Sequence, residues 1–204
     1  MPRIDDYINA KKLAGKTLSQ ESFGAILERS GYESPATNTL RVPFLDRTYQ
    51  IRYPEFEFED LVNTGKEIPI QEEVLILHYL ATADMPPPSS DWVSYREIPG
   101  ASFYFSAFVK RAIDPLKKVF GRNLSGFAQA SEKLNSTKIE PGDAGFEFMV
   151  FPYVPLQLIL WAGDDEFPEE ANILFDRTIE KILSPEDVAW MAGMVVYRLI
   201  ALSR

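Results

Sequence analysis

Cysteine is absent from the 204-residue chain. Without thiols the chain cannot form disulfide bonds, thiolate zinc sites, cysteine-ligated iron–sulfur clusters or cysteine nucleophiles. Histidine is almost as scarce, because His78 is the only one. A single imidazole cannot supply the histidine sets of common zinc sites or of iron sites with two histidines and one carboxylate. Metal sites built mainly on thiolates or imidazoles are therefore excluded.

Several diagnostic motifs are also missing. The sequence has no P-loop, no G-x-G-x-x-G after an expected strand, no H-E-x-x-H and no G-x-S-x-G. The longest apolar run, Val188–Leu202, contains Arg198 and is too short to cross a bilayer. The first residues, MPRIDDYINAKK, carry acids where a secretory signal peptide would be apolar. We therefore expect a cytoplasmic protein that does not associate with membranes.

The charge balance is strongly acidic, with a net charge of -9 and a pI near 4.8. This balance argues against nucleic acid as a partner, because phosphate binding needs a basic face. Apolar residues make up 46% of the chain, which is enough to build a core at this length. We expect a single domain over residues 1–204, with an N-terminal helical segment at 1–35 and a main body at 36–204.

Apolar residues that recur every three or four positions predict several helices. The first is expected over Ile4–Ala14, and a second should follow Thr17 as N-cap and end near Gly31. Further helices are expected in IPIQEEVLILHYLATAD, from Ser102 to about Phe120 with a kink or a restart at Pro115, over Ser125–Leu134, and after Ser184 as N-cap with Pro185 in the first position. The last helix is apolar on nearly all sides, which indicates burial in the core or in a dimer interface.

Two-residue alternation predicts two β-hairpins. The first pairs TLRVPF with RTYQIRY around a turn at Asp46, and Pro43 suggests that its first arm is an edge strand. The second pairs Phe146–Phe151 with Leu156–Trp161, and NILF is expected as a further short strand. Strands and helices do not alternate in regular βαβ units. The expected fold is therefore α+β, with an antiparallel or mixed sheet that contains two hairpins and is packed by several helices.

The most acidic stretch follows the second hairpin and contains five carboxylates between residues 164 and 170. Oxygen ligands that converge in a tight turn suit Ca²⁺ or Mg²⁺, which makes Asp164, Asp165 and Glu166 weak candidates for a metal site. Their spacing is not that of an EF-hand. The favoured interpretation is a structural or solvated turn that holds Arg177 or another basic side chain, with Phe167 packed back onto the sheet.

Three other features have both a functional and a structural interpretation, and we favour the structural one for each. His78 lies on the apolar stripe of its helix, where a partly buried histidine is more common than a ligand or catalyst. Trp92 and Tyr95 belong to an aromatic stretch that could line a ligand pocket or pack in a core. A basic cluster could hold an anion or form the solvated face of a helix, and it consists of Lys110, Arg111, Lys117, Lys118 and Arg122.

Four phrases together resemble the DUF3786 family, an uncharacterised family of bacteria and archaea: ILHYLATAD, WVSYREIPGASFYFSAF, PLKKVFG and LILWAGDDEFPEEANILFD. The resemblance runs from about the first hairpin to the last helix. It implies an association with corrinoid and one-carbon proteins of anaerobes, because some members look like fusions to an N-terminal iron–sulfur cluster domain. The family gives no catalytic residues to carry over. A corrinoid or haem cofactor follows from this association alone, and the sequence itself requires no cofactor.

Two hypotheses of function follow. The favoured one is a non-catalytic accessory module that binds a ligand or another protein, or forms a homodimer through the apolar C-terminal helix. Its contact residues would be Trp92, Tyr95, Lys117, Lys118, Asp164, Asp165 and Glu166. The alternative is an enzyme that uses the carboxylate-rich loop at 164–170, with or without a divalent cation. In that case Asp165 or Glu166 would act as base or metal ligand, with His78 in support.

Overall fold

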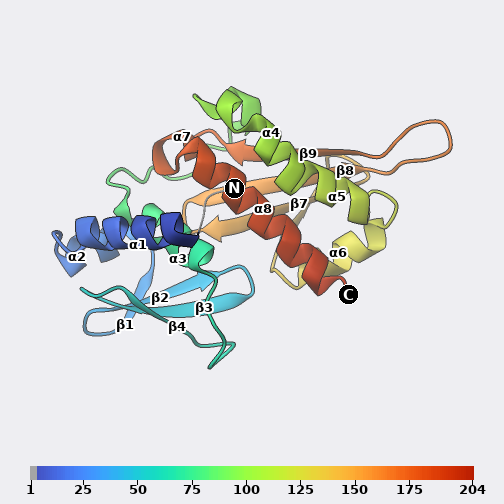
Figure 1. The fold of residues 1–204 in the computed structure, drawn as a ribbon. Helices are drawn as coiled ribbons and strands as arrows, with labels where there is room; N and C mark the ends of the chain where they lie inside the picture. The colour runs from blue at the N-terminus through green and yellow to red at the C-terminus, as the bar shows by residue number, and fades with distance from the viewer. Residues whose placement is uncertain (1–3) are drawn as a thin grey trace. The chain divides into compact units, whose positions relative to one another are not determined.

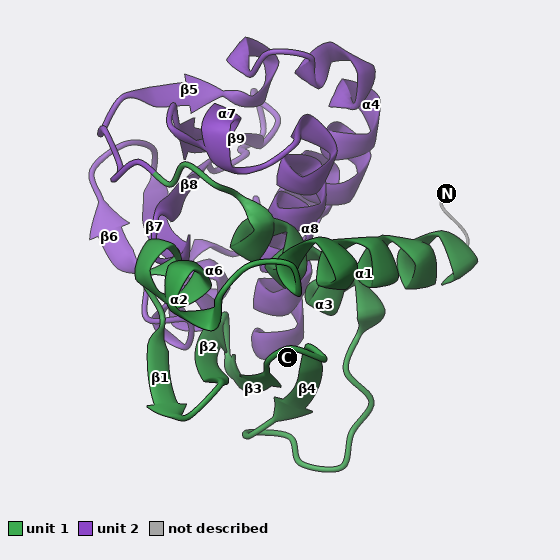
Figure 2. Cartoon of the chain, turned by 90° about the vertical axis from the view of Figure 1, so that its left-hand side faces the viewer, with its two compact units in different colours: residues 1–85 green, residues 86–204 purple. Residues whose placement is uncertain are grey.

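The computed structural model describes residues 4–204 and contains two antiparallel sheets and several helices (Figure 1). The predicted α+β class and both predicted hairpins are confirmed. The internal contacts gather residues 1–85 and residues 86–204 into two compact units, here called unit 1 and unit 2 (Figure 2). Within residues 4–204, no helix is both long enough and apolar enough to cross a membrane.

In its described part, residues 4–85, unit 1 combines a four-stranded antiparallel sheet with three helices. Its elements are α1 (Ile4–Leu18), α2 (Phe23–Ser30), β1 (Glu33–Ala36), β2 (Thr39–Phe44), β3 (Arg47–Arg52), β4 (Glu57–Asp60) and α3 (Ile70–Ala81). The strands pair in sequence order, β1-β2-β3-β4. The expectation that the first hairpin arm is an edge strand is wrong, because β1 pairs with β2 at Thr39 and Arg41. Pro43 lies beyond that pairing, so its missing N–H removes no bond to β1.

The start of α2 also differs from the prediction. Thr17 lies inside α1, where its hydroxyl donates to the Leu13 carbonyl at 3.1 Å. The actual N-cap is Ser22, whose Oγ accepts the Ala25 N–H at 3.2 Å. The predicted end at Gly31 is confirmed, since this residue caps the helix in the left-handed region with φ 71°.

A buried polar network joins the sheet of unit 1 to α3. The Tyr49 hydroxyl donates to Glu72 at 2.5 Å, and Arg47 forms a salt bridge with Asp60 at 3.3 Å. Burial raises the pKa of Glu72, and the Tyr49 hydrogen bond and the Arg47 charge offset this effect only in part. Asp60 also accepts the N–H groups of the two residues that follow Leu61, both at 2.9 Å. The network therefore fixes the end of β4 and the face of α3 together.

Unit 2 is built on a five-stranded antiparallel sheet of order β5-β9-β8-β7-β6. Its strands are β5 (Trp92–Ser94), β6 (Thr137–Ile139), β7 (Ala144–Phe151), β8 (Val154–Trp161) and β9 (Glu170–Asp176). Its α-helices are α4 (Phe105–Phe108), α5 (Asp114–Phe120), α6 (Leu124–Glu132), α7 (Ile179–Ile182) and α8 (Pro185–Leu202). Short 3₁₀ turns, η1 (Tyr95–Glu97) and η2 (Ala101–Phe103), link β5 to α4. The central strand β8 is buried from Val154 to Leu160.

The long helix predicted from Ser102 to Phe120 is interrupted. A π-helical turn, η3 (Val109–Ile113), separates α4 from α5, and the Asp114 N–H bonds the Val109 carbonyl five residues earlier. Pro115, where a kink or a restart was predicted, lacks an N–H and lies in the first turn of α5, after Asp114. The structure has the restart, and a widened turn that was not predicted precedes it.

The predicted N-terminus of α8 is confirmed, because the Ser184 Oγ accepts the Asp187 N–H at 3.2 Å and Pro185 follows it. The apolar residues of α8 are largely buried, and the helix packs on α4, η3, α5 and α6. Gly193 permits a close approach, since a Cβ there would lie 3.4 Å from the Arg111 carbonyl oxygen. Packing within unit 2 thus accounts for the apolar composition of α8, and the homodimer stays a prediction.

Asp176 holds together the segments at the end of β9. This carboxylate is 1% exposed and accepts bonds from the Ser90 N–H (2.6 Å), the Ser89 hydroxyl (3.0 Å) and both the N–H and hydroxyl of Thr178. Burial alone would raise the pKa of Asp176, but the hydrogen bonds from Thr178 and Ser89 outweigh it, and the pKa is lowered.

We expect Asp176→Asn to lower the free energy of unfolding by about 1–3 kcal/mol at pH 7, because an amide nitrogen would face donors. Urea unfolding of the full chain measures this difference, with the exposed Asp165→Asn as the control that should leave the midpoint unchanged. Because the folded pKa of Asp176 is lowered, its contribution is present above about pH 4 and is lost as the pH falls through the folded pKa. A difference that stays constant down to pH 2 would contradict this account.

Candidate functional site

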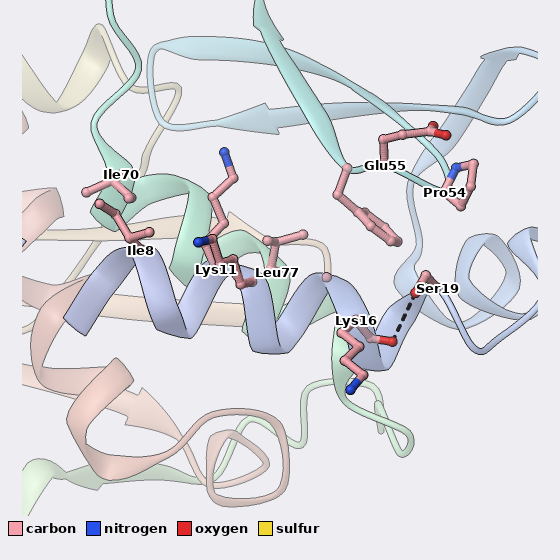
Figure 3. Close-up of a pocket in the computed structure, with 11 residues that line it drawn as sticks. Ile8, Lys11, Lys16, Ser19, Pro54, Glu55, Ile70 and Leu77 are labelled. Atoms are coloured by element: carbon pink, nitrogen blue, oxygen red, sulfur yellow. Dashed lines mark hydrogen bonds between the residues drawn. The ribbon is translucent and has the colours of Figure 1, made fainter. Parts of the chain in front are cut away.

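A pocket of about 600 Å³ opens in unit 1 beside α1 (Figure 3). Its walls come from α1, from the turn between β3 and β4, and from α3. The apolar lining consists of Ile8, Phe56, Ile70 and Leu77. The volume lies within the range of about 300–1,000 Å³ that is usual for small-molecule sites.

One flank of α1 supplies five of the lining residues at helical spacing, and Ser19 continues the row directly after the helix. The five are Ile8, Lys11, Lys12, Gly15 and Lys16. Steps of three and four residues bring these side chains to the same side of the helix. Ala14 and Leu18 lie on a different side and are buried. The helix therefore has a core face and, next to it, a pocket face that carries three lysines.

The three lysines differ in their partners. The Lys11 Nζ lies 2.8 Å from the Glu73 Oε1 and 5.5 Å from the centroid of the Phe58 ring. Lys12 and Lys16 are exposed, and neither forms a salt bridge with any residue from 4 to 204. Like charges one turn apart repel each other, so an anion between them would be stabilised by both. Two cationic groups of the pocket are thus available to a ligand.

The opposite rim carries Pro54 and Glu55, on the turn that precedes β4 (Figure 3). Glu55 is exposed and is the only carboxylate of the lining. The pocket is therefore apolar at its base, basic along α1 and acidic at one point of the far rim. Such a site can hold an apolar body and place a single anionic group at the lysines.

The predicted acidic site is a hydrogen-bonded turn. The Asp164 Oδ1 accepts the N–H groups of Glu166 (2.8 Å) and Phe167 (2.7 Å), and these bonds lower the pKa of Asp164. Asp165 and Glu166 are exposed. The expectation that Phe167 packs back onto the sheet is wrong, because its side chain is 66% exposed. Within residues 4–204, no three acidic or histidine side chains are grouped to hold a metal ion.

The base of this loop is anchored to the end of α5. The Gly163 N–H donates to the Gly121 carbonyl at 3.2 Å, and Arg122 lies 3.8 Å from Glu169. A Cβ at Gly163 would lie 2.7 Å from the Glu169 nitrogen, so only glycine fits this crossing. The basic partner of the loop is thus Arg122, whereas Arg177 pairs with Asp91.

The other predicted residues are spread over both units. His78, on α3 of unit 1, is half-buried, and its carbonyl accepts the Thr82 hydroxyl at 3.3 Å. In unit 2, Trp92 is half-buried on β5. Tyr95 is buried, donates its hydroxyl to the Pro185 carbonyl at 2.6 Å and stacks on Phe108 with ring centroids 4.2 Å apart. Tyr95 also lines a small pocket.

The residues of the predicted basic cluster differ in their contacts and do not form one group. The guanidinium of Arg111 lies 4.2 Å from the centroid of the Trp190 ring, and Arg122 is the cation beside Glu169. Lys117 is half-buried and Lys118 is exposed. Lys110 lies in the π-helical turn, which changes its angular position on the helix relative to Lys117 and Lys118.

The sequence patterns did not lead us to predict the row of Lys11, Lys12 and Lys16 on α1, here called the lysine stripe. The segment Ile4–Ala14 was interpreted as a weakly amphipathic helix, and it ended before Lys16 and Ser19. The signal that could have found the stripe is the regular recurrence from Ile8 to Ser19 once the helix is extended to Leu18. The apolar base of the pocket comes from other elements, and the helix pattern alone carries no information on it.

We expect Asp164→Ala to increase hydrogen exchange at the amides of Glu166 and Phe167, because both lose their acceptor. Exchange measured by mass spectrometry on the full chain checks this, and the urea midpoint should not change. Asp165→Ala is the matched control and should leave the exchange of the loop as it is. Faster exchange in the control but not in the variant would contradict the assignment of the turn to Asp164.

Comparison with known proteins identifies one related group. Residues 22–198 match the family described as "Domain of unknown function (DUF3786)". The matched region begins after α1, so the lysine stripe rests on the residues of this chain alone. No match to the chain was found among curated proteins or solved structures. Because the match covers most of its length, the chain belongs to the DUF3786 family.

Proposed function

We propose that this protein is a non-catalytic binding module in which the pocket beside α1 holds an organic anion with an apolar body. The observation that carries the proposal is the pair Lys12 and Lys16, which have no acidic partner among residues 4–204 and lie at the wall of an apolar pocket. The protein as a whole carries a net charge of -9, so the positive charge of this pair differs in sign from the average of the chain.

The chemistry of the lining limits the ligand. A lysine ammonium is a point charge that accepts carboxylate, phosphate or sulfonate without the paired geometry that arginine selects. Ile8, Phe56 and Ile70 would bury an aliphatic or aromatic body. Glu55 on the far rim disfavours a second negative charge at that end. The preferred class is therefore a mono-anionic acid with an apolar tail or ring.

The chemical groups that line the pocket favour binding over catalysis. The residues that line the pocket include no histidine and only one carboxylate, whereas acid–base chemistry commonly needs two groups in defined positions. The enzymatic alternative would require Asp165 or Glu166 beside a second reactive group. Neither side chain forms a salt bridge or hydrogen bond with another residue from 4 to 204. The proposed link to corrinoid and one-carbon proteins rests on the family resemblance alone. In that case such a protein would be the binding partner of this one.

A pair of fluorescent probes tests the proposal. Anilinonaphthalene sulfonate and N-phenyl-1-naphthylamine share an apolar body, but only the first carries an anionic group. We expect Lys12→Gln/Lys16→Gln to weaken binding of the sulfonate by about two- to fivefold per lysine, the range for solvent-exposed charge pairs. Binding of the neutral probe should not change, because the apolar lining is intact.

Arg41→Gln/Lys66→Gln is the matched control, because it removes two exposed positive charges from unit 1 outside the pocket. It should leave both affinities as they are. If both double variants weaken binding of the sulfonate equally, the effect is due to net charge alone. That result would contradict the proposed site. A loss of both probes in the lysine variant would indicate that an apolar surface, and not an anion site, had been changed.

A further inference from the structure

The outer edge of β9 is only partly covered. The ladder between β5 and β9 ends at the pair Ser94↔Leu174, whereas the ladder between β8 and β9 continues to Trp161↔Glu170. Residues 170–173 of β9 therefore have a strand partner on one side only. The chain leaves the sheet at this point through the 3₁₀ turn η1.

The register identifies the backbone groups that face the open side. The Arg177 N–H donates to the Asp91 carbonyl at 2.8 Å, at the start of the β5–β9 ladder. In an antiparallel ladder the groups that face one neighbour recur at every second residue. Those of Phe175 and Ile173 face β5 by this rule, and the pair Ser94↔Leu174 requires a bond to the Ile173 carbonyl from the residue after Ser94. The N–H and C=O of Ala171 face the same side beyond the end of the ladder. Backbone groups at an uncovered sheet edge are a template for one more strand.

A pocket of about 270 Å³ lies against this edge. One wall is formed by Tyr95 and Arg96, and another by Phe105 and Phe108, which α4 supplies. Tyr95 and Phe108 are held in place by their own stacking and by the bond from Tyr95 to Pro185. The pocket is smaller than the range of about 300–1,000 Å³ for larger ligands, so it suits a single apolar side chain.

Arg96 supplies a charge at the same place. Its guanidinium carbon lies 3.8 Å from the centroid of the Phe105 ring, and the side chain is exposed. Within residues 4–204 it forms no salt bridge. A guanidinium keeps most of its donors while it stacks on a ring, and its planar fork fits a carboxylate with two bonds.

We propose that this edge binds the carboxyl-terminal end of an extended peptide from a partner protein. The peptide adds a short strand beside Ala171, places its last side chain against Phe105 and Phe108, and pairs its terminal carboxylate with Arg96. The three features require different parts of the same ligand: backbone amides, one apolar side chain and a carboxylate. Only a peptide end supplies all three together.

The site belongs to unit 2 and shares no residue with the pocket beside α1. It assigns a second activity to the protein, which is capture of a protein partner through its terminus. Either proposal can fail without the other, because the variants that test them change different units.

A library of synthetic hexapeptides with free carboxyl termini and apolar last residues provides the probe. The tightest binder is remade with a terminal amide and as an N-methylated series, and affinities are measured by fluorescence anisotropy with the full chain. We expect the amide and Arg96→Gln each to weaken binding about tenfold, the scale of one charge-assisted contact. Arg96 is exposed, so the variant should fold normally.

The backbone contribution is tested by Ala171→Pro, which removes an N–H that faces the open edge, where proline is tolerated. Ala171→Ser keeps the N–H and is the control. We expect binding to be lost in the proline variant and kept in the serine variant. If the proline variant is misfolded, N-methylation of the peptide next to its last residue provides the same test from the ligand side.

Three results would overturn the proposal. The first is a library from which no peptide binds. The second is binding that the terminal amide and N-methylation leave unchanged. The third is competition by benzoate or octanoate at the same concentrations as the best peptide, because that would assign the pocket to small acids.

Discussion

Antiparallel pairing is the constraint on which both units depend. In unit 1 the register Val42↔Tyr49 places the side chains of both residues in the core, and in unit 2 the register Phe146↔Leu158 does the same. Once these pairs are fixed, alternation decides which side chains are buried and which backbone groups remain open. The uncovered edge of β9 arises in this way, because β5 is three residues long and its partner is seven.

The pocket beside α1 depends on a second constraint, which is that one face of this helix packs in the core and the face next to it lines the pocket. The face with Ala14 and Leu18 is used for packing, and α1 and α3 lie in contact. The flank next to it then carries Lys12 and Lys16, which form no salt bridge with a carboxylate among residues 4–204. Within unit 1 some cations are paired, such as Arg29 with Glu21 and Arg47 with Asp60, whereas Arg41 and Lys66 are exposed and form no salt bridge among residues 4–204. What distinguishes Lys12 and Lys16 from those two is their place in the lining of an apolar pocket, and this is the physical basis for assigning them to a ligand.

Part of the fold could be predicted from local sequence patterns. The two hairpins, the glycine end of α2 and the serine cap of α8 follow from alternation and from residues with one dominant structural preference. Errors arose where two local signals competed. Thr17 resembles an N-cap, but its hydroxyl bonds back to Leu13 because α1 continues, and Ser22 takes the cap. At Pro115 a kink or a restart was expected; the helix does restart there, but the π-helical turn before it was not predicted.

The functional features were harder to predict because they join segments that are distant in sequence. The acidic loop drew attention by its composition, yet Asp164 uses its carboxylate to close a turn and Arg122 supplies the cation. The α1 pocket needs Phe56, Ile70 and Leu77 from other elements, and the β9 edge is defined by where β5 stops. No pattern within one helix or strand contains that information. It becomes available only when the register and the helix packing are known.

The most direct test of the central claim is NMR of the protein with ¹³C-dimethylated lysines, titrated with octanoate. Dimethylation keeps the positive charge of each lysine while it makes each side chain visible as a separate signal. The account predicts that the signals of Lys12 and Lys16 shift together and saturate, and that those of Lys66 and Lys138 remain in place. A titration in which all exposed lysines shift alike, or in which Lys12 and Lys16 do not respond, would contradict an anion site beside α1.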